Sequence, residues 1–125
     1  MKDMEKVMKA LSDKTRLRIL NLLGPGPLCV CEVVEVIGLS QSTVSKHLSL
    51  LKDAGLIQDE RRGKWIYYAL NPGGDVFGRK VLALVLEEAR RDPGAREDLA
   101  ACGRCRCGPD GTEKVLPRGR RGMRP

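Results

Sequence analysis

The sequence predicts a mainly α-helical fold with one small β-hairpin, on three grounds. Apolar residues recur at helical spacing in several segments, glycine and proline separate these segments, and two β-prone runs flank a basic turn. The chain has 125 residues, which is the length of one compact domain with an additional tail. We therefore expect the order helix, helix, helix, helix, strand, strand, helix.

The first two helices are expected at residues 2–11 and 14–23. Apolar residues in the first recur at positions i, i+3, i+4 and i+7, and they are Met4, Val7, Met8 and Leu11. Ser12 or Asp13 caps the second helix, whose inward stripe is Leu17, Leu20 and Leu23. The Gly-Pro-Gly-Pro run at residues 24–27 ends it.

A short third helix and a longer fourth helix follow. The third has a buried stripe of Val30, Val33, Val34 and Ile37. Gly38 ends the third helix, and Ser40 is a good N-cap for the fourth. The core face of the fourth helix is Val44, Leu48 and Leu51, and Ala54-Gly55 closes it. These two helices have the order of a helix-turn-helix.

A hairpin and a last helix complete the predicted domain. Residues 57–60 and 65–70 are β-prone, and a basic turn joins them. After a break at residues 71–74, Asp75 caps a helix that reaches about Arg91 and carries Phe77, Val81, Leu84 and Val85. The complete order, ααααββα, is that of a winged helix-turn-helix with flanking helices.

The composition changes after this helix. Residues 92–125 are rich in glycine, proline and arginine and poor in apolar residues, so burial would not offset the entropy lost on ordering them. We therefore expect a folded domain at residues 1–91 and a flexible Cys/Arg/Gly-rich tail at residues 92–125.

Charge and compartment narrow the class of protein. A formal net charge of +7 and a pI near 9.4 favour a polyanionic partner such as nucleic acid. Residues 1–6 lack the apolar core of a secretory signal, and no run is long enough to cross a bilayer. We expect a cytoplasmic protein with no membrane partner, in which the five cysteines are thiols for metal or redox chemistry.

The polar face of the fourth predicted helix is suited to double-stranded DNA. Its candidate DNA-binding residues are Gln41, Ser42, Thr43, Ser45 and Lys46. Glutamine pairs bidentately with adenine in the major groove, while serine and lysine reach base edges or phosphates. The alternative is a solvated face with no ligand. His47 either contacts the DNA backbone or packs beside the core.

The hairpin turn supplies a second basic element, made of Arg61, Arg62 and Lys64 around a glycine. Such a turn can lie along a phosphate strand or enter the minor groove. The alternative is an exposed basic turn.

Cys29 and Cys31 are candidate ligands of a soft metal ion at the start of the third helix. Cysteines at i and i+2 of a regular helix point about 200° apart. Cys29 must therefore precede the helix, or the first helical turn must open. A helix N-terminus lowers the pKa of a thiol, which favours the thiolates that soft ions bind. The alternative is that both cysteines are small buried apolar residues.

Four segments together carry a family resemblance: ALSDKTRLRIL at residues 10–20, CVCE at 29–32, SQSTVSKHLSLLKDAGLI at 40–57 and RRGKWIYYAL at 61–70. They resemble the ArsR/SmtB family of metal-responsive repressors. The resemblance implies a homodimer that pairs its first and last helices, binds an inverted-repeat operator, and releases it when a metal or metalloid binds. Many relatives carry histidine at the position of Lys46.

The resemblance also bears on the metal ligands. Arsenic-sensing relatives often have a third cysteine at the position that Val34 occupies here. Either two thiolates suffice, or a third ligand comes from the predicted tail, which contains Cys102, Cys105 and Cys107 at ligand-like spacing. The zinc site that other relatives build from Asp, Glu and His across the last helices is excluded, because the chain has a single histidine.

We therefore expect a transcriptional repressor, not an enzyme, that leaves its operator when As(III) or Sb(III) binds Cys29 and Cys31. Within the same family, the effector could instead be Cd(II), Pb(II) or methylarsenite, which requires only two sulfurs. A thiol-disulfide switch or oxidoreductase built on Cys102 and Cys105 is an alternative of another class. A metal carrier whose basic face serves only solubility is a third.

Overall fold

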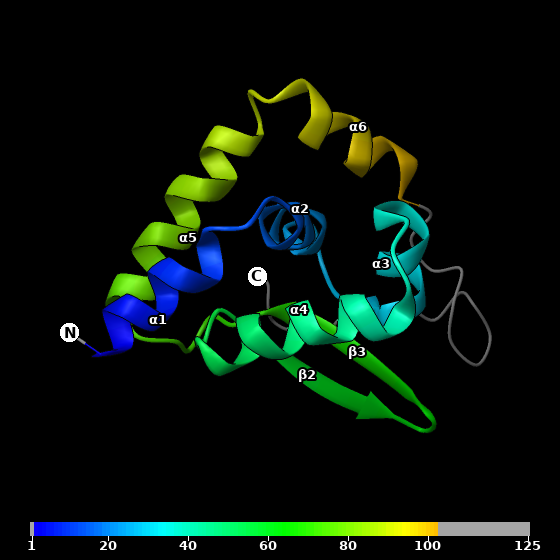
Figure 1. Ribbon diagram of the computed structural model, residues 1–125, viewed down its shortest axis with the longest axis horizontal. Helices are drawn as coiled ribbons and strands as arrows, with labels where there is room; N and C mark the ends of the chain where they lie inside the picture. The colour runs from blue at the N-terminus through cyan, green and yellow to red at the C-terminus, as the bar shows by residue number, and fades with distance from the viewer. Residues whose placement is uncertain (1, 103–125) are drawn as a thin grey trace.

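The computed structural model describes residues 2–102, and in this range the predicted mainly helical class with a hairpin is confirmed (Figure 1). Its elements are α1 (Lys2–Leu11), α2 (Lys14–Leu23), β1 (Leu28–Cys29), α3 (Val30–Ile37), α4 (Gln41–Asp53), β2 (Ile57–Arg62), β3 (Trp65–Leu70), α5 (Val76–Ala89) and α6 (Pro93–Ala101). Two of them, β1 and α6, are additional to the predicted order. None of the described helices is long and apolar enough to span a membrane.

Side-chain caps fix where the helices begin. The carboxylate of Asp13 accepts a hydrogen bond from the backbone N–H of Arg16 at 3.1 Å, so Asp13 rather than Ser12 is the cap of α2. Ser40 caps α4 and Asp75 caps α5 in the same way, as predicted. α3 ends at Gly38, whose φ of 82° is a left-handed conformation that glycine adopts without steric cost.

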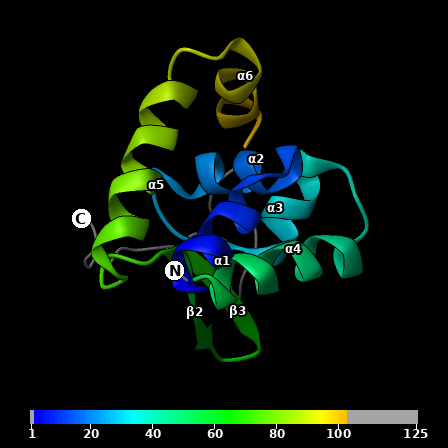
Figure 2. The ribbon, with the colours of Figure 1, turned by 60° about the vertical axis from the view of Figure 1, so that its left-hand side comes forward.

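The three strands form an antiparallel sheet in the order β1-β3-β2. Arg62 pairs with Trp65 at the closed end of the β2–β3 hairpin, which protrudes from the helical body (Figures 1 and 2). The short strand β1 pairs Leu28 with Tyr68 and Cys29 with Tyr67. Sequence reasoning missed β1, since two residues carry no detectable alternation. Because β1 pairs with β3, Cys29, the first predicted thiol ligand, belongs to the sheet.

The core is built around α2, which lies between α1, α3, α4 and α5 (Figure 2). Ile19, Leu20, Leu22 and Leu23 of α2 are fully buried. One predicted core position is wrong, because Leu17 is 36% exposed. Leu84 of α5 is 66% exposed. With Met4, Met8 and Val76, they leave apolar side chains exposed on α1, α2 and α5.

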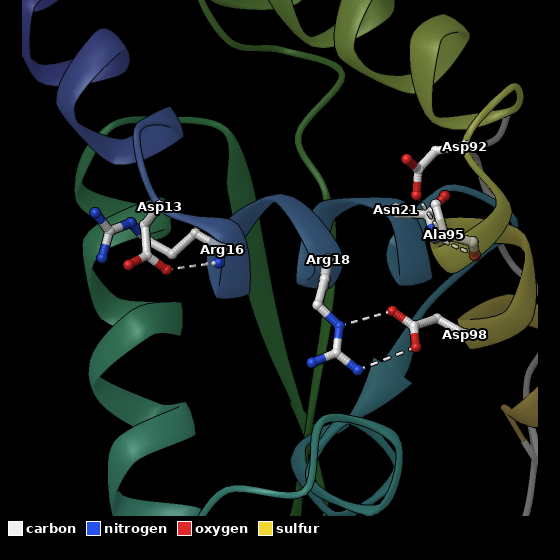
Figure 3. Close-up of polar contacts among 7 residues, drawn as sticks. All are labelled: Asp13, Arg16, Arg18, Asn21, Asp92, Ala95 and Asp98. Atoms are coloured by element: carbon white, nitrogen blue, oxygen red, sulfur yellow. Dashed lines mark hydrogen bonds and ion pairs between the residues drawn. The ribbon is translucent and has the colours of Figure 1, made fainter.

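The predicted flexible tail is wrong for residues 93–101, which form α6 against α2 (Figure 3). Asp98 accepts two hydrogen bonds from the guanidinium of Arg18, at 2.8 and 3.0 Å, and the buried Asn21 side chain donates to the Ala95 carbonyl at 2.9 Å. These long-range partners offset the low apolar content on which the prediction relied. The rest of the predicted tail after Cys102 lies outside the described residues.

Candidate nucleic-acid interface and thiol site

α4 separates an apolar face from a polar one, as the sequence predicted. Val44, Leu48 and Leu51 are fully buried. Gln41, Ser42, Lys46 and Ser49 are exposed on the other side, and Ser45 is half-buried beside them. Thr43 takes part in the cap, because the Ser40 hydroxyl donates to its Oγ1 at 2.9 Å. The exposed side chains therefore lie on a helix whose position is fixed by its buried face.

His47 faces the junction between α1 and α2. Its Nδ1 lies 3.1 Å from Nη1 of Arg16 and 4.0 Å from a carboxylate oxygen of Asp13. Arg16 also donates to the Ala10 carbonyl at 2.7 Å and to the Lys9 carbonyl at 3.2 Å, at the end of α1. The half-buried ring thus links α4 to the preceding helices, and its contact with DNA stays a prediction.

The β2–β3 hairpin presents the three predicted cations at its tip. Arg61 and Lys64 are exposed, whereas Arg62 is half-buried with its guanidinium 5.0 Å from the centre of the Tyr67 ring. A further contact joins the hairpin to α4, because Lys52 donates to Asp59 at 3.1 Å. Sequence reasoning missed this ion pair, since its partners lie on different elements. It helps to fix the hairpin relative to the polar face of α4.

The two predicted thiol ligands converge at the start of α3. Cys29 is the N-cap residue with extended backbone, φ −83° and ψ 163°, and Cys31 lies in the first turn. Their Sγ atoms are 2.7 Å apart. Of the two predicted solutions, Cys29 preceding the helix is therefore confirmed. Glu32 reaches back so that its Oε1 accepts from the Cys29 N–H at 2.9 Å, which leaves the carboxylate of a buried residue beside the thiols.

The predicted lowering of the thiol pKa is wrong for Cys29. Burial raises the pKa of this thiol to about 11 from its ordinary value of 9.0, and the neighbouring Glu32 carboxylate also raises it. The backbone N–H groups at the helix start act in the opposite direction but are outweighed. Cys29 is therefore a neutral, 1% exposed thiol at neutral pH, and any bound ion must displace its proton.

Within residues 2–102, the structure brings no third ligand to the pair. Among residues 2–102, no three His, Cys, Asp or Glu side chains are grouped so that they could hold a metal ion. Cys102 follows α6 as its C-cap residue and packs against the edge of the core. Val34 packs against the core. Cys105 and Cys107 lie outside the described residues.

Comparisons with known proteins agree on one family. The family model described as "Bacterial regulatory protein, arsR family" matches residues 13–59, which include α2, α3 and α4. The arsenic resistance transcriptional regulator ArsR1 of Pseudomonas putida is 46% identical over 67 residues, 53% of this chain and 52% of that protein. ArsR2 of the same organism is 40% identical over 82 residues, 65% of this chain and 71% of that protein.

A solved structure of similar fold supports the winged helix-turn-helix assignment. The homodimeric winged helix-turn-helix domain of Mb0332 from Mycobacterium bovis, described as a possible ArsR-family regulator, is 31% identical to this chain. It superimposes with a TM-score of 0.61 over 72% of this chain and 81% of that one. The predicted winged helix-turn-helix is therefore confirmed.

Proposed function

Because this chain belongs to the ArsR family of bacterial regulatory proteins, we propose that it is a homodimeric repressor that releases operator DNA when a thiophilic effector binds Cys29 and Cys31. The observation that carries the proposal is the convergence of two sulfurs at the start of α3, the helix that precedes the exposed polar face of α4. The match spans about half of the length of ArsR1, so the proposal concerns this chain's own residues.

DNA binding would use two elements. Gln41, Ser42, Ser45 and Lys46 would enter the major groove, where glutamine reads adenine and lysine reaches a phosphate. The hairpin would place Arg61, Arg62 and Lys64 along the backbone or in the adjacent minor groove. The net charge of +7 supports this assignment, because each neutralised phosphate releases counterions and strengthens binding.

Dimerisation would cover the apolar side chains that one protomer leaves exposed. Met4 and Met8 lie on α1, and Val76 and Leu84 lie on α5. Large exposed apolar residues of this kind mark interaction surfaces. A two-fold dimer would place its α4 helices about one DNA turn apart, roughly 34 Å, which matches an inverted-repeat operator.

The effector would be As(III) or Sb(III), held by the thiolates of Cys29 and Cys31 and by one of Cys102, Cys105 or Cys107. Arsenous acid exchanges its hydroxyl groups for thiolates, and each thiol proton leaves with a hydroxyl group as water. The ion must then fit where Cys29 now caps α3, so that binding distorts the start of the helix that packs on α4. Cd(II) or Pb(II) would bind the same sulfurs.

A second candidate effector is methylarsenite. It offers two exchangeable hydroxyl groups, which equals the number of sulfurs that the described residues bring together. A thiol-redox switch, the alternative of another class, would instead use Cys102 and Cys105 and would need an oxidant such as peroxide.

The test is a fluorescence anisotropy titration of labelled promoter duplex with the full chain. Arsenite, antimonite, methylarsenite, cadmium, lead and zinc are added separately, and mild peroxide is added in a further arm. We expect arsenite to weaken DNA binding about 5- to 150-fold, the usual range of allosteric coupling. A triple Cys102→Ser, Cys105→Ser, Cys107→Ser variant shows whether a third thiolate is needed.

Two results would overturn the proposal. Absence of salt-dependent duplex binding would exclude a repressor and favour a metal carrier. Release by peroxide but not by arsenite would identify a redox sensor.

A further inference from the structure

The wing and the thiol site share one strand, and this placement links the two proposed binding events. We propose that Tyr67 is a positioning residue through which occupation of the thiol site changes the orientation of Arg62 on the wing. This inference rests on the proposed function. It names a residue that contacts neither base edges nor the effector's reacting atoms.

The first link joins Cys29 to Tyr67. These residues are direct partners in the antiparallel pairing of β1 with β3. Directly opposed residues project to the same face of a sheet, with Cβ atoms about 4.5–5.5 Å apart. Both are buried, with 1% of Cys29 and 8% of Tyr67 exposed, so neither can move without displacing its neighbours.

The second link joins Tyr67 to Arg62. The guanidinium of Arg62 lies over the Tyr67 ring, 5.0 Å from its centre. The same guanidinium donates to Oε1 of Glu60 at 3.3 Å. Arg62 is therefore held by a ring below and a carboxylate beside it. Its neighbour Arg61 is held differently, because it donates to the Gly63 carbonyl at 3.2 Å.

The effector would act on this series of contacts, from Cys29 through Tyr67 to Arg62, at the buried Cys29. Arsenous acid bound at Cys29 replaces an S–H proton with an arsenic atom, because an As–S bond forms, an As–O bond breaks, and water leaves. The larger group must be accommodated next to Tyr67. β1 consists of two residues and pairs only with β3 in the described sheet, so a displacement of Cys29 is transmitted to Tyr67. Rotation of the ring removes the surface on which Arg62 rests.

A matched pair of wing variants tests the link. Arg61→Gln and Arg62→Gln each remove one cation and should weaken DNA binding to a similar degree. The arsenite-induced loss of DNA affinity should be unchanged in Arg61→Gln. In Arg62→Gln it should be about 2- to 30-fold smaller than in the wild type, the range by which residues within a coupling network modulate coupling. An equal arsenite effect in both variants would overturn the inference.

The single tryptophan of the chain supplies a direct readout, because Trp65 pairs with Arg62 at the hairpin end. Arsenite should change Trp65 fluorescence in the wild type and in Tyr67→Phe, which keeps the ring. Tyr67→Leu removes the ring and should lose most of this change while still binding arsenite, as measured by equilibrium dialysis. A full fluorescence response in a folded Tyr67→Leu protein would contradict the inference.

Failure of the inference and failure of the proposed function give different results. If arsenite does not bind the wild type, or binds without releasing DNA, then the proposed function fails. If arsenite binds and releases DNA but Arg62→Gln and Tyr67→Leu respond like the wild type, then only the role of Tyr67 fails. Circular dichroism melting identifies any variant that has lost its fold, and Arg62→Gln leaves the buried ring in place.

Discussion

The polar face of α4 and the thiol pair at the start of α3 belong to neighbouring helices but differ in how ready they are to bind. Gln41, Ser42 and Lys46 are exposed on a helix that three fully buried residues hold in place. Cys29 is buried, protonated at neutral pH and engaged as the cap residue of α3. One region presents its groups to solvent, and the other must change before a ligand can bind.

This difference explains how a small domain could act as a switch. A preformed DNA-binding face requires no reorganisation, so the protein without effector would be the form that binds DNA. A closed effector site requires its ligand to do work on the surrounding structure, and only such differential interaction can shift a conformational equilibrium.

The largest effect is expected from removing the thiols of Cys29 and Cys31. A Cys29→Ser, Cys31→Ser double variant should bind the operator like the wild type but lose the whole arsenite response, about 5- to 150-fold in DNA affinity. The measurement is fluorescence anisotropy with and without arsenite. Val30→Ala, between the two cysteines, is the control for a change at the start of α3 that leaves both thiols in place. Normal release of DNA by the double variant would show that the effector binds elsewhere.

The raised pKa of Cys29 predicts a pH dependence that separates two effectors. Cadmium must displace the Cys29 proton into solvent, so its affinity should rise about tenfold per pH unit for this proton between pH 6 and 8. When arsenite binds, the thiol proton leaves with a hydroxyl group as water. The affinity for arsenite should therefore change little between pH 6 and 8. Isothermal titration in buffers of different ionisation enthalpy counts the protons. A flat cadmium profile would show that Cys29 is not a ligand.

The same shift has a consequence for stability. The folded Cys29 thiol has a pKa of about 11, and its ordinary value is 9.0, so the unfolded chain ionises first. The free energy of unfolding should therefore fall as pH rises from 9 towards 11. Cys29→Ala should remove this part of the pH dependence in denaturant titrations, whereas Cys102→Ala should keep it.

A smaller effect on DNA affinity is expected from a substitution on the polar face of α4. Lys46→Gln should weaken operator binding roughly tenfold at 0.1 M salt and lower the salt slope by about one, the effect of one lost phosphate contact. Lys52→Gln is the matched control, because Lys52 lies on the same helix but pairs with Asp59. An unchanged salt slope in Lys46→Gln would remove this lysine from the interface.

The smallest effect concerns the N-cap of α4, the helix that carries the polar face. Ser40 accepts a hydrogen bond from the Thr43 N–H at 3.2 Å. Ser40→Ala should cost about 1 kcal/mol of unfolding free energy without DNA, measured by denaturant unfolding. Ser40→Asp, which keeps an acceptor, should retain stability. A neutral Ser40→Ala substitution would mean that α4 is fixed by its buried residues alone.

The sequence was most informative where structure depends on near neighbours. Ser40 and Asp75 cap their helices as predicted, and Asp13 is one of the two predicted caps of α2, because an N-cap contact spans only three residues. The polar and apolar faces of α4 followed from helical spacing for the same reason. α5 was harder, since its apolar residues surround the helix, and the buried Leu82 is not among the residues that the sequence analysis singled out.

The features that were missed depend on distant residues. β1 exists through its pairing with β3, and α6 is held by Arg18 and Asn21 on α2. One local signal for α6 was present, because Asp92 followed by Pro93 is a typical helix start, and the Asp92 side chain accepts from the Ala95 N–H. The predicted lowering of the Cys29 pKa was also wrong, since burial is a tertiary property that outweighed the local effect of the helix start.

The backbone of Cys29 offers a rule for engineering. Because this residue is extended and Cys31 is helical, two positions separated by one residue bring their sulfurs together at the start of a helix. A designer could graft a Cys-x-Cys pair onto the first residues of another regulator's helix, provided that a strand residue leads directly into that helix. On the proposed function, such a graft is expected to make a constitutive DNA-binding protein responsive to a thiophilic ion with two substitutions.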